Sequence, residues 1–277
     1  MAVIFALWKR NLKAFWRNKP ALIINALFPL FFIFVFGEIF RNDYIENAVP
    51  FMMAGIAIAM VFDSALRISA NTIDDITSGF MKEVLVSPVS RLTIALGQFA
   101  SSATIATLQG IVILCLGFFL GLTITSAWTL VFALIAMIAI GFVFAGFGLF
   151  IAARAKNIQT YQAVSMALTM PMTFLSGAFI PLSMLNDILR TIAYFNPMTY
   201  GVALFRSIML ERLGDPADQL VATELAIRIG DFTITPLYSA LILLVFGVIF
   251  ITLATISFVK LDFSKMNRNK ADSLEFE

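Results

Sequence analysis

The sequence predicts an all-α integral membrane protein with six transmembrane helices. Of its 277 residues, 60% are hydrophobic and only 13% are charged, whereas soluble domains average about 45–50% apolar and about 25% charged residues. Six segments are apolar over the length that a bilayer crossing requires. Lysine and arginine are also unevenly distributed between the segments that join these spans. Composition, span length and charge distribution therefore indicate the same fold class.

The N-terminal segment 3–19 is expected to form an interfacial elbow helix. Its apolar side chains, including Phe5, Leu7 and Trp16, fall largely on one side of a helix, and its basic residues fall largely on another. Such a helix lies along a membrane surface with its cationic side chains toward anionic headgroups. It serves as an anchor for the first span, and it is also suited to contact a cytoplasmic partner.

The six spans are expected at 21–37, 49–68, 92–120, 128–153, 158–180 and 236–259. A helix needs about 20 mainly apolar residues to cross a hydrocarbon core of about 30 Å. The strict alternation of a membrane β-barrel is absent, so helix is the secondary structure that satisfies the backbone in lipid.

The positive-inside rule orients these spans. With both termini in the cytoplasm, thirteen lysines and arginines fall in inner segments and five fall in outer segments, while Arg67 lies inside the second span. An odd number of spans would lose this asymmetry. We therefore expect a multi-pass protein of the cytoplasmic (inner) membrane with both termini cytoplasmic.

The segment TSGFMKEVLVSPVSR, residues 77–91, interrupts two very apolar stretches. Phe80, Val84 and Leu85 recur at helical spacing while Lys82 and Glu83 face away. Pro88 would end this helix or turn the chain into the third span. The spacing suggests a short cytoplasmic helix here, although composition alone favours an ordinary amphipathic loop at the headgroups.

The outer segment 181–235 is too apolar in its first part to be a solvated loop. Two half-length helices flank Asn196-Pro197, the second expected from Thr199 to Leu213, and together they suggest a hairpin that dips into the outer leaflet. A flat interfacial pair is the alternative. The more polar residues 214–231 suggest a small external cap.

Charges inside the spans are few, and Asp63 and Arg67 stand four residues apart on the second span. This spacing puts both on one helix face, where they can pair. A structural pair near the inner interface is the simpler interpretation, and proton coupling is the alternative.

Several kinds of chemistry are excluded by residue type. Histidine is absent and Cys115 is the one cysteine, which argues against serine–histidine catalysis, disulfides and the usual metal sites. No GxxxxGK[ST] loop occurs, so the chain is expected to bind no nucleotide, cofactor or metal itself. The net charge of +2 gives no indication of nucleic-acid binding.

Two motifs resemble those of one family. GFMKEVLVSPVSR and FLSGAFIPLSMLNDILRTIAYFNPMTYGVALFR, residues 79–91 and 174–206, are similar to the two signatures of type-2 ATP-binding-cassette exporter permeases, a group that includes daunorubicin-resistance and nodulation-factor exporters. The layout of the chain is also similar across nearly its whole length.

The resemblance implies a coupling helix in loop 69–91 that docks on a separate ATPase. By position this role falls to Gly79, Phe80, Met81, Lys82, Glu83, Val84, Leu85, Pro88 and Arg91. It also implies an outer gate hairpin that involves Gly177, Pro181, Asn196 and Pro197.

On this basis one membrane domain, 1–277, is expected to combine the elbow helix 3–19, spans 21–68, the coupling loop, spans 92–180, the outer hairpin and cap 181–235, the last span 236–259 and a cytoplasmic tail 260–277.

The expected assembly is a homodimer in membrane lipid above two cytosolic ATPase subunits, which bind ATP and Mg. ATP-driven closure would tilt spans one, two and five and move a hydrophobic or amphipathic drug-like or lipid-like compound outward. Met166, Met170, Met172 and Phe174 are candidate pathway-lining residues, and core packing explains them equally well. A polysaccharide or lipid-linked glycan exporter is the rival within the family, and an ion-gradient-driven secondary transporter is the rival of another class.

Overall fold

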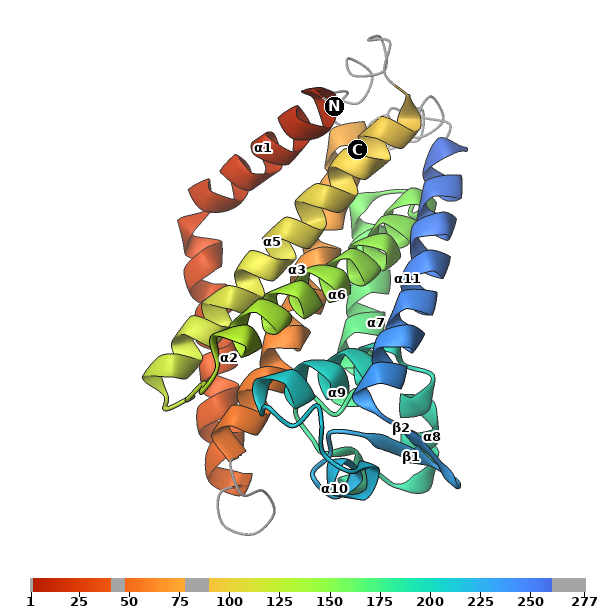
Figure 1. Cartoon of the computed structure of the whole chain (residues 1–277). Helices are drawn as coiled ribbons and strands as arrows, with labels where there is room; N and C mark the ends of the chain where they lie inside the picture. The colour runs from red at the N-terminus through yellow and green to blue at the C-terminus, as the bar shows by residue number, and fades with distance from the viewer. Residues whose placement is uncertain (1, 41–47, 78–89, 261–277) are drawn as a thin grey trace.

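The computed structural model describes residues 2–40, 48–77 and 90–260 of the chain. Its long helices run side by side in one bundle (Figure 1). They are α1 (Ala2–Arg17), α2 (Lys19–Phe40), α3 (Ala48–Thr77), α5 (Arg91–Phe119), α6 (Ala127–Arg154), α7 (Ile158–Phe174) and α11 (Pro236–Val259). The segment between α7 and α11 forms a cap at one end of the bundle (Figure 1).

Within the described ranges, four helices are long and apolar enough to cross a membrane: α3, α5, α6 and α11. The chain is thus a multi-pass, mostly helical membrane protein. The apolar part of α2, Lys19–Ile33, is shorter, and α7 has 17 residues. The arrangement of six spans therefore stays a prediction for these two helices.

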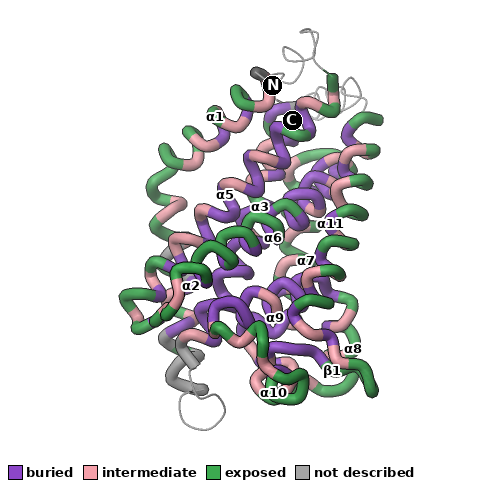
Figure 2. Tube along the Cα trace, in the orientation of Figure 1, coloured by how far each residue is buried: buried purple, intermediate pink, exposed green. Residues whose placement is uncertain are grey.

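Helix α3 is the centre of the bundle. Every residue from Phe51 to Phe62 is buried, and the buried path of α3 runs through the middle of Figure 2. It packs against α5, α6 and α9 (Pro197–Met209). Gly148 of α6 allows close approach, because a Cβ there would lie 2.7 Å from the Ser69 hydroxyl oxygen. Small residues at such contacts let membrane helices pack at short distance.

Helix α1 covers the predicted elbow segment and packs along α5. Leu7 is buried against Gly97, and the indole nitrogen of Trp8 donates a hydrogen bond of 3.1 Å to Thr104. The chain leaves the helix only at Asn18 before α2 begins. Lys9, on the opposite side of α1, is exposed, as the amphipathic pattern predicts.

The fifth predicted span is shorter than expected. The prediction extended it to residue 180, but α7 ends at Phe174. The Ser176 hydroxyl donates to the Thr173 carbonyl at 2.7 Å, and Gly177 then adopts a φ of +82°. A left-handed residue ends a helix, and glycine adopts it without a steric penalty.

The cap contains the two predicted half-length helices, α8 (Asp187–Tyr194) and α9, on either side of Asn196. A 3₁₀ turn, η1 (Leu182–Met184), precedes α8. Helix α9 ends at Met209 instead of Leu213 because Glu211 adopts a left-handed φ of 57°. Nearly all of α9 is buried, whereas α8 exposes Ile188 and Ile192.

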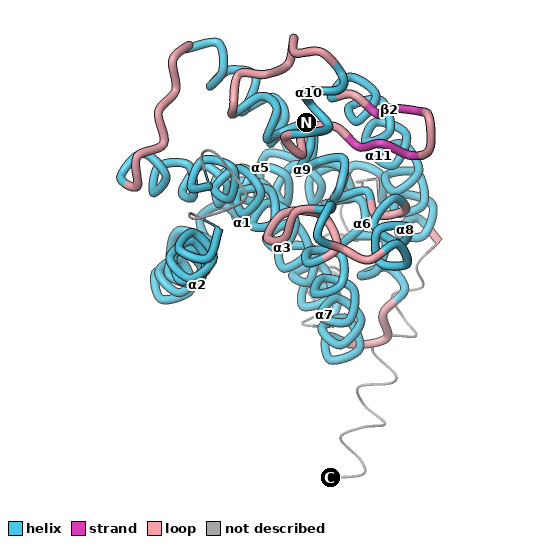
Figure 3. The backbone as a smooth tube through the Cα atoms, turned by 90° about the horizontal axis from the view of Figure 1, so that it is seen from below, coloured by secondary structure: helices cyan, strands magenta, loops and turns pink. Residues whose placement is uncertain are grey.

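A β-hairpin after the short helix α10 (Ala217–Ala222) was not predicted. Strands β1 (Ile227–Ile229) and β2 (Phe232–Ile234) pair antiparallel, with Ile227 opposite Ile234. They lie at the edge of the bundle when it is seen from below (Figure 3). Three-residue strands are too short to produce a recognisable alternating pattern in a sequence.

Candidate functional site

A cavity of about 770 Å³ lies between α2, α3 and α7 and is partly open to the surroundings. Seen from below, α2 and α7 lie on the same side of the bundle (Figure 3). Helix α7 contributes a single face to the cavity because its lining residues recur every three or four positions. These are Ile158, Tyr161, Gln162, Ser165, Met166, Thr169, Met170, Thr173 and Phe174.

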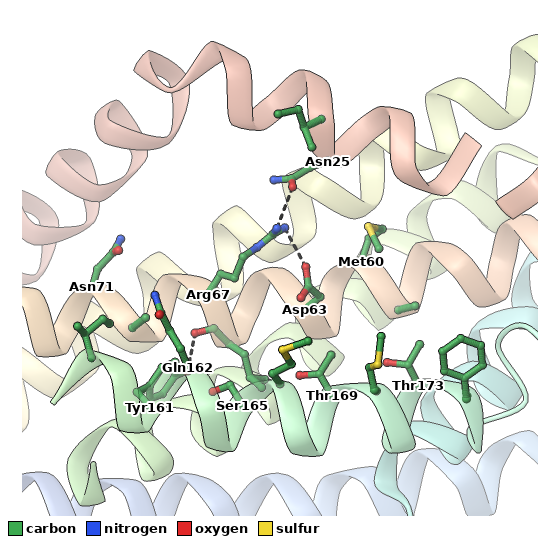
Figure 4. A pocket seen from close by; sticks show the side chains of 18 of the residues that line it. Asn25, Met60, Asp63, Arg67, Asn71, Tyr161, Gln162, Ser165, Thr169 and Thr173 are labelled. Atoms are coloured by element: carbon green, nitrogen blue, oxygen red, sulfur yellow. Dashed lines mark hydrogen bonds and ion pairs between the residues drawn. The ribbon is translucent and has the colours of Figure 1, made fainter. Parts of the chain in front are cut away.

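The lining of the cavity is amphipathic. Met60, Met166 and Phe179 are among its apolar members, and Gln162 and Thr169 are among its polar ones. Helix α7 is held in place partly by Tyr161, whose buried hydroxyl donates to the Leu66 carbonyl oxygen at 2.6 Å. Figure 4 shows the α7 side chains directed toward α3. The arrangement suits an elongated molecule with apolar and polar parts.

An ion pair lies in the wall that α3 provides. Arg67 Nη2 is 2.9 Å from Asp63 Oδ2, and Arg67 Nη1 donates to Asn25 Oδ1 of α2 at 2.8 Å (Figure 4). The Arg67 side chain is 45% exposed and that of Asp63 is 32% exposed. Both charges thus face the cavity instead of being enclosed in the core, and Arg67 links α3 to α2.

Of the four candidate lining residues, Met166, Met170 and Phe174 line this cavity. Met172 is not among its lining residues and packs against the hydrophobic core. Its backbone carbonyl accepts a hydrogen bond of 2.6 Å from Asn196 Nδ2. The sequence prediction grouped these residues by composition, without considering the helix face on which each one falls.

The residues of the predicted outer gate hairpin lie between the end of α7 and the first residue of α9. Asn196 caps α9 by accepting a hydrogen bond of 3.0 Å from the Met198 amide, and Pro197 is the first residue of α9. Pro181 precedes η1, and Gly177 lies in the turn after α7. Asn196 connects the hairpin to α7 through the Met172 carbonyl.

Sequence reasoning missed Arg206, the largest fully buried side chain among the described residues. Its Nε donates to the Phe51 carbonyl at 3.1 Å and its Nη2 donates to the Gly177 carbonyl at 2.9 Å. The guanidinium carbon lies 3.4 Å from the centre of the Phe51 ring, a cation–π distance. Arg206 falls within the second motif, but nothing in its spacing distinguishes a buried arginine from an exposed one.

The predicted coupling residues Gly79, Phe80, Met81, Lys82, Glu83, Val84, Leu85 and Pro88 lie outside the described residues. Arg91 is described and begins α5. Its Nη1 donates to the Val259 carbonyl at 2.7 Å, at the C-terminal end of α11. A cation at a helix C-terminus satisfies free carbonyl groups and the negative end of the helix dipole.

A polar network connects α1 to the two helices that flank residues 78–89. Asp75 Oδ2, near the end of α3, accepts from Arg10 Nη2 at 2.5 Å and from Gln98 Nε2 at 3.1 Å. Asn11 Nδ2 donates to Gln98 Oε1 at 3.1 Å and closes the network. Asn11 and Gln98 are almost completely buried, at 3% and 1% exposure. The network therefore ties α1, α3 and α5 together at the base of this loop.

Comparison with known proteins assigns the family. The profile of the ABC-2 type transporter family matches residues 2–210, which include α1 to α9. The chain belongs to the ABC-2 type transporter family. It is therefore a membrane permease subunit of an ABC-type exporter, and membership implies an associated ATP-binding cassette subunit.

Known members of this family are similar over most of their length. The chain is 30% identical to Nodulation protein J of Sinorhizobium fredii over 224 residues, which is 76% of this chain and 82% of that protein. It is 29% identical to Nodulation protein J of Rhizobium meliloti over 220 residues, 74% of this chain and 80% of that protein. The ycf38 protein of Cyanophora paradoxa, which is named as a transport permease, is 26% identical over 73% of this chain and 72% of its own length.

Proposed function

We propose that this ABC-2 permease forms a homodimer that exports a hydrophobic or amphipathic, drug-like or lipid-like compound across the cytoplasmic membrane. The observation that carries the proposal is the amphipathic cavity of about 770 Å³ between α2, α3 and α7. Methionine suits such a site because its flexible thioether adapts to ligands of different shape. In this proposal the cargo occupies that cavity, beside the Asp63–Arg67 pair.

Exposed polar residues on α7 favour the proposal of a homodimer. Gln159, Thr160 and Gln162 are exposed on α7, although polar side chains are disfavoured against lipid. The cavity is also only partly enclosed by this chain. A second permease facing α2 and α7 would cover these polar groups and close the cavity, which would then lie between the two copies.

In this proposal the energy for transport comes from ATP hydrolysis by separate ATPase subunits. Two cytosolic ATPase subunits bind ATP and Mg in this proposal, and they contact the permease through Gly79 to Leu85, Pro88 and Arg91. The loop joins the end of α3 to the start of α5, so a force on it would act first on helices that the Asp75–Gln98 hydrogen bond ties together. Both termini are then cytoplasmic, in agreement with the distribution of basic residues.

The experiment is substrate-stimulated ATP hydrolysis by the permease–ATPase complex in liposomes. The probes are rhodamine 6G as an amphipathic dye, a fluorescent phospholipid and a lipid-linked oligosaccharide. We expect the dye or the phospholipid to stimulate hydrolysis and to be transported. Stimulation by the oligosaccharide alone would instead favour the glycan exporter, and transport driven by an ion gradient without ATP would favour a secondary transporter.

Tryptophan substitutions that fill part of the cavity test whether the cargo binds there. Met166→Trp and Met170→Trp place an indole in the cavity, because both methionines line it and are exposed on α7. Leu244→Trp is the control, since Leu244 is 63% exposed on α11 and does not line the cavity. We expect transport to fall at least tenfold in the first two variants and to stay unchanged in the control. Equal transport in all three would contradict the assignment of the cavity as the cargo site.

A further inference from the structure

A second, polar cavity of about 320 Å³ lies where α1 meets α2, against α3 and α5. It shares Asn25, Arg67 and Asn71 with the larger cavity. Its other polar lining residues are Asn11, Asn18 and Ser64. Among the described residues, its lining contains one cationic residue, Arg67, and no carboxylate. Arg67 is paired with Asp63, which lines the larger cavity together with Asp74, so the positive charge at this cavity is partly neutralised.

Arg67 and Asn25 retain hydrogen-bond donors at this cavity, and Asn71 offers both a donor and an acceptor. A guanidinium has five N–H groups. In Arg67, Nη1 donates to Asn25 Oδ1 and Nη2 pairs with the Asp63 carboxylate. The Asn25 carbonyl oxygen is occupied by Arg67, which leaves its amide NH₂ group. In Figure 4, Arg67 extends from α3 toward α2, away from the α7 side chains, and Asn71 extends to the same side.

Ser64 contributes a buried hydroxyl group without a partner at the wall of this cavity. The residue is 3% exposed and is among those that line the polar cavity. Its hydroxyl has no hydrogen-bond partner within the described part of the chain. Buried hydroxyl groups are normally paired, since an unpaired one costs about 1–3 kcal/mol. A serine in a helix usually donates to the carbonyl four residues earlier, as Ser69 does to Ala65.

We propose that this cavity binds the phosphate headgroup of a phospholipid. The fork of Arg67, the amide groups of Asn25 and Asn71 and the Ser64 hydroxyl together supply donors to phosphate oxygens. Phe15, Leu22, Ile68 and Ile105 line the same cavity and suit the glycerol and the first methylene groups of a lipid. Free phosphate would leave these apolar residues uncovered, so a lipid is the favoured source.

The surroundings agree with an anionic membrane ligand. Lys13, Arg17 and Lys19 lie on the same bend between α1 and α2 and are exposed. Such basic groups attract anionic headgroups, each by about 1 kcal/mol near a membrane surface. In the proposed orientation the lipid belongs to the cytoplasmic leaflet. Because Arg67 lines both cavities, a bound phosphate would compete with Asp63 for the guanidinium and change the charge that the larger cavity presents.

The test is lipid binding by the purified full-length chain in a neutral detergent, followed by native mass spectrometry and thermal unfolding. Dioleoylphosphatidylglycerol, dioleoylglycerol and inorganic phosphate are the three probes. We expect the phospholipid to bind and to raise the Tm, and neither of the other two to do so at equal concentration. Equal binding of dioleoylglycerol would overturn the phosphate assignment, and equal binding of inorganic phosphate would overturn the lipid assignment.

Paired variants locate the binding site. The double variant S64A/N71A removes two donor groups from the cavity, and we expect the Kd for dioleoylphosphatidylglycerol to rise about tenfold. Ser239→Ala is the matched control, because the Ser239 hydroxyl is also buried and unpartnered within the described residues but lies on α11, outside the cavity. Unchanged binding in S64A/N71A would overturn the proposal. This assay needs no transport and no ATPase, so its outcome is independent of the proposed export function.

Discussion

Arg206 Nη2 donates a hydrogen bond of 2.9 Å to the Gly177 carbonyl oxygen and so fastens α9 to the turn that follows α7. The same guanidinium reaches Phe51 at the start of α3 through its Nε. One fully buried side chain therefore joins three segments that are far apart in the sequence, at the end of the bundle where the cap lies.

Arg206→Met is expected to destabilise the protein. Methionine fills a similar volume but leaves two buried carbonyl groups without this donor, and each such group costs about 1–3 kcal/mol. A loss of about 2–4 kcal/mol should lower the Tm in detergent by about 5–15 °C. Arg212→Met is the control, since Arg212 is 42% exposed and pairs with Asp215 at 3.8 Å. Equal Tm values for the two variants would show that Arg206 does not hold these segments together.

Gly55→Ala should disturb the same region through packing. A Cβ at Gly55 would lie 2.4 Å from the Ala178 carbonyl oxygen and 2.8 Å from Arg206 Nη2. The carbonyl oxygen belongs to the backbone, so α3 or the turn must move, at a cost of about 1–3 kcal/mol. Thermal unfolding of Gly214→Ala provides the comparison, because nothing lies within 4 Å of a Cβ there. A Gly55→Ala protein as stable as this control would contradict the close contact.

Glu211 gives a pH-dependent prediction. Its Oε1 accepts hydrogen bonds from the Thr129 hydroxyl at 2.8 Å and from the Ser126 and Thr125 amides at the start of α6. These bonds, with the one from Thr129 the largest contribution, hold the pKa of the Glu211 carboxyl below its usual 4.5. A group whose pKa is lower in the folded state stabilises the protein above its unfolded pKa, and it loses this effect as the pH falls through the folded pKa.

The measurement is the Tm of the wild type and of Glu211→Gln as a function of pH. We expect the wild type to unfold at a higher temperature at neutral pH and this difference to shrink as the pH falls below about 4.5. A difference that does not change with pH would indicate that the contribution of Glu211 does not depend on its charge.

Asn11 and Gln98 are expected to be energetically coupled. Their hydrogen bond is buried, and each also contacts a second member of the network, Arg10 and Asp75 respectively. A double-mutant cycle with Asn11→Ala and Gln98→Ala should give an interaction energy of about 0.5–3 kcal/mol in unfolding. Strict additivity of the two single changes would mean that α1 is not fastened to α5 by this bond.

Composition and hydrophobic periodicity predicted the membrane class and most helix positions, because lipid imposes helices of restricted length and polarity. The spacing of Asp63 and Arg67 correctly places both on one face of α3. The separation of Met172 from Met166 and Met170 follows from helical spacing and could have been predicted. Burial of Arg206 depends on which tertiary surfaces meet, and a one-dimensional pattern does not contain that information. The polar network of Asp75 and Gln98 was missed for the same reason, since its members are 23 residues apart.

The central claim is that the permease is driven by a separate ATPase through the loop that contains Lys82 and Glu83. The most direct measurement is substrate-stimulated ATP hydrolysis and transport by the reconstituted complex, with the double variant K82A/E83A beside the wild type. We expect the variant complex to assemble but to lose most of the stimulation, with transport reduced at least tenfold. Stimulation and transport equal to those of the wild-type complex would contradict the account.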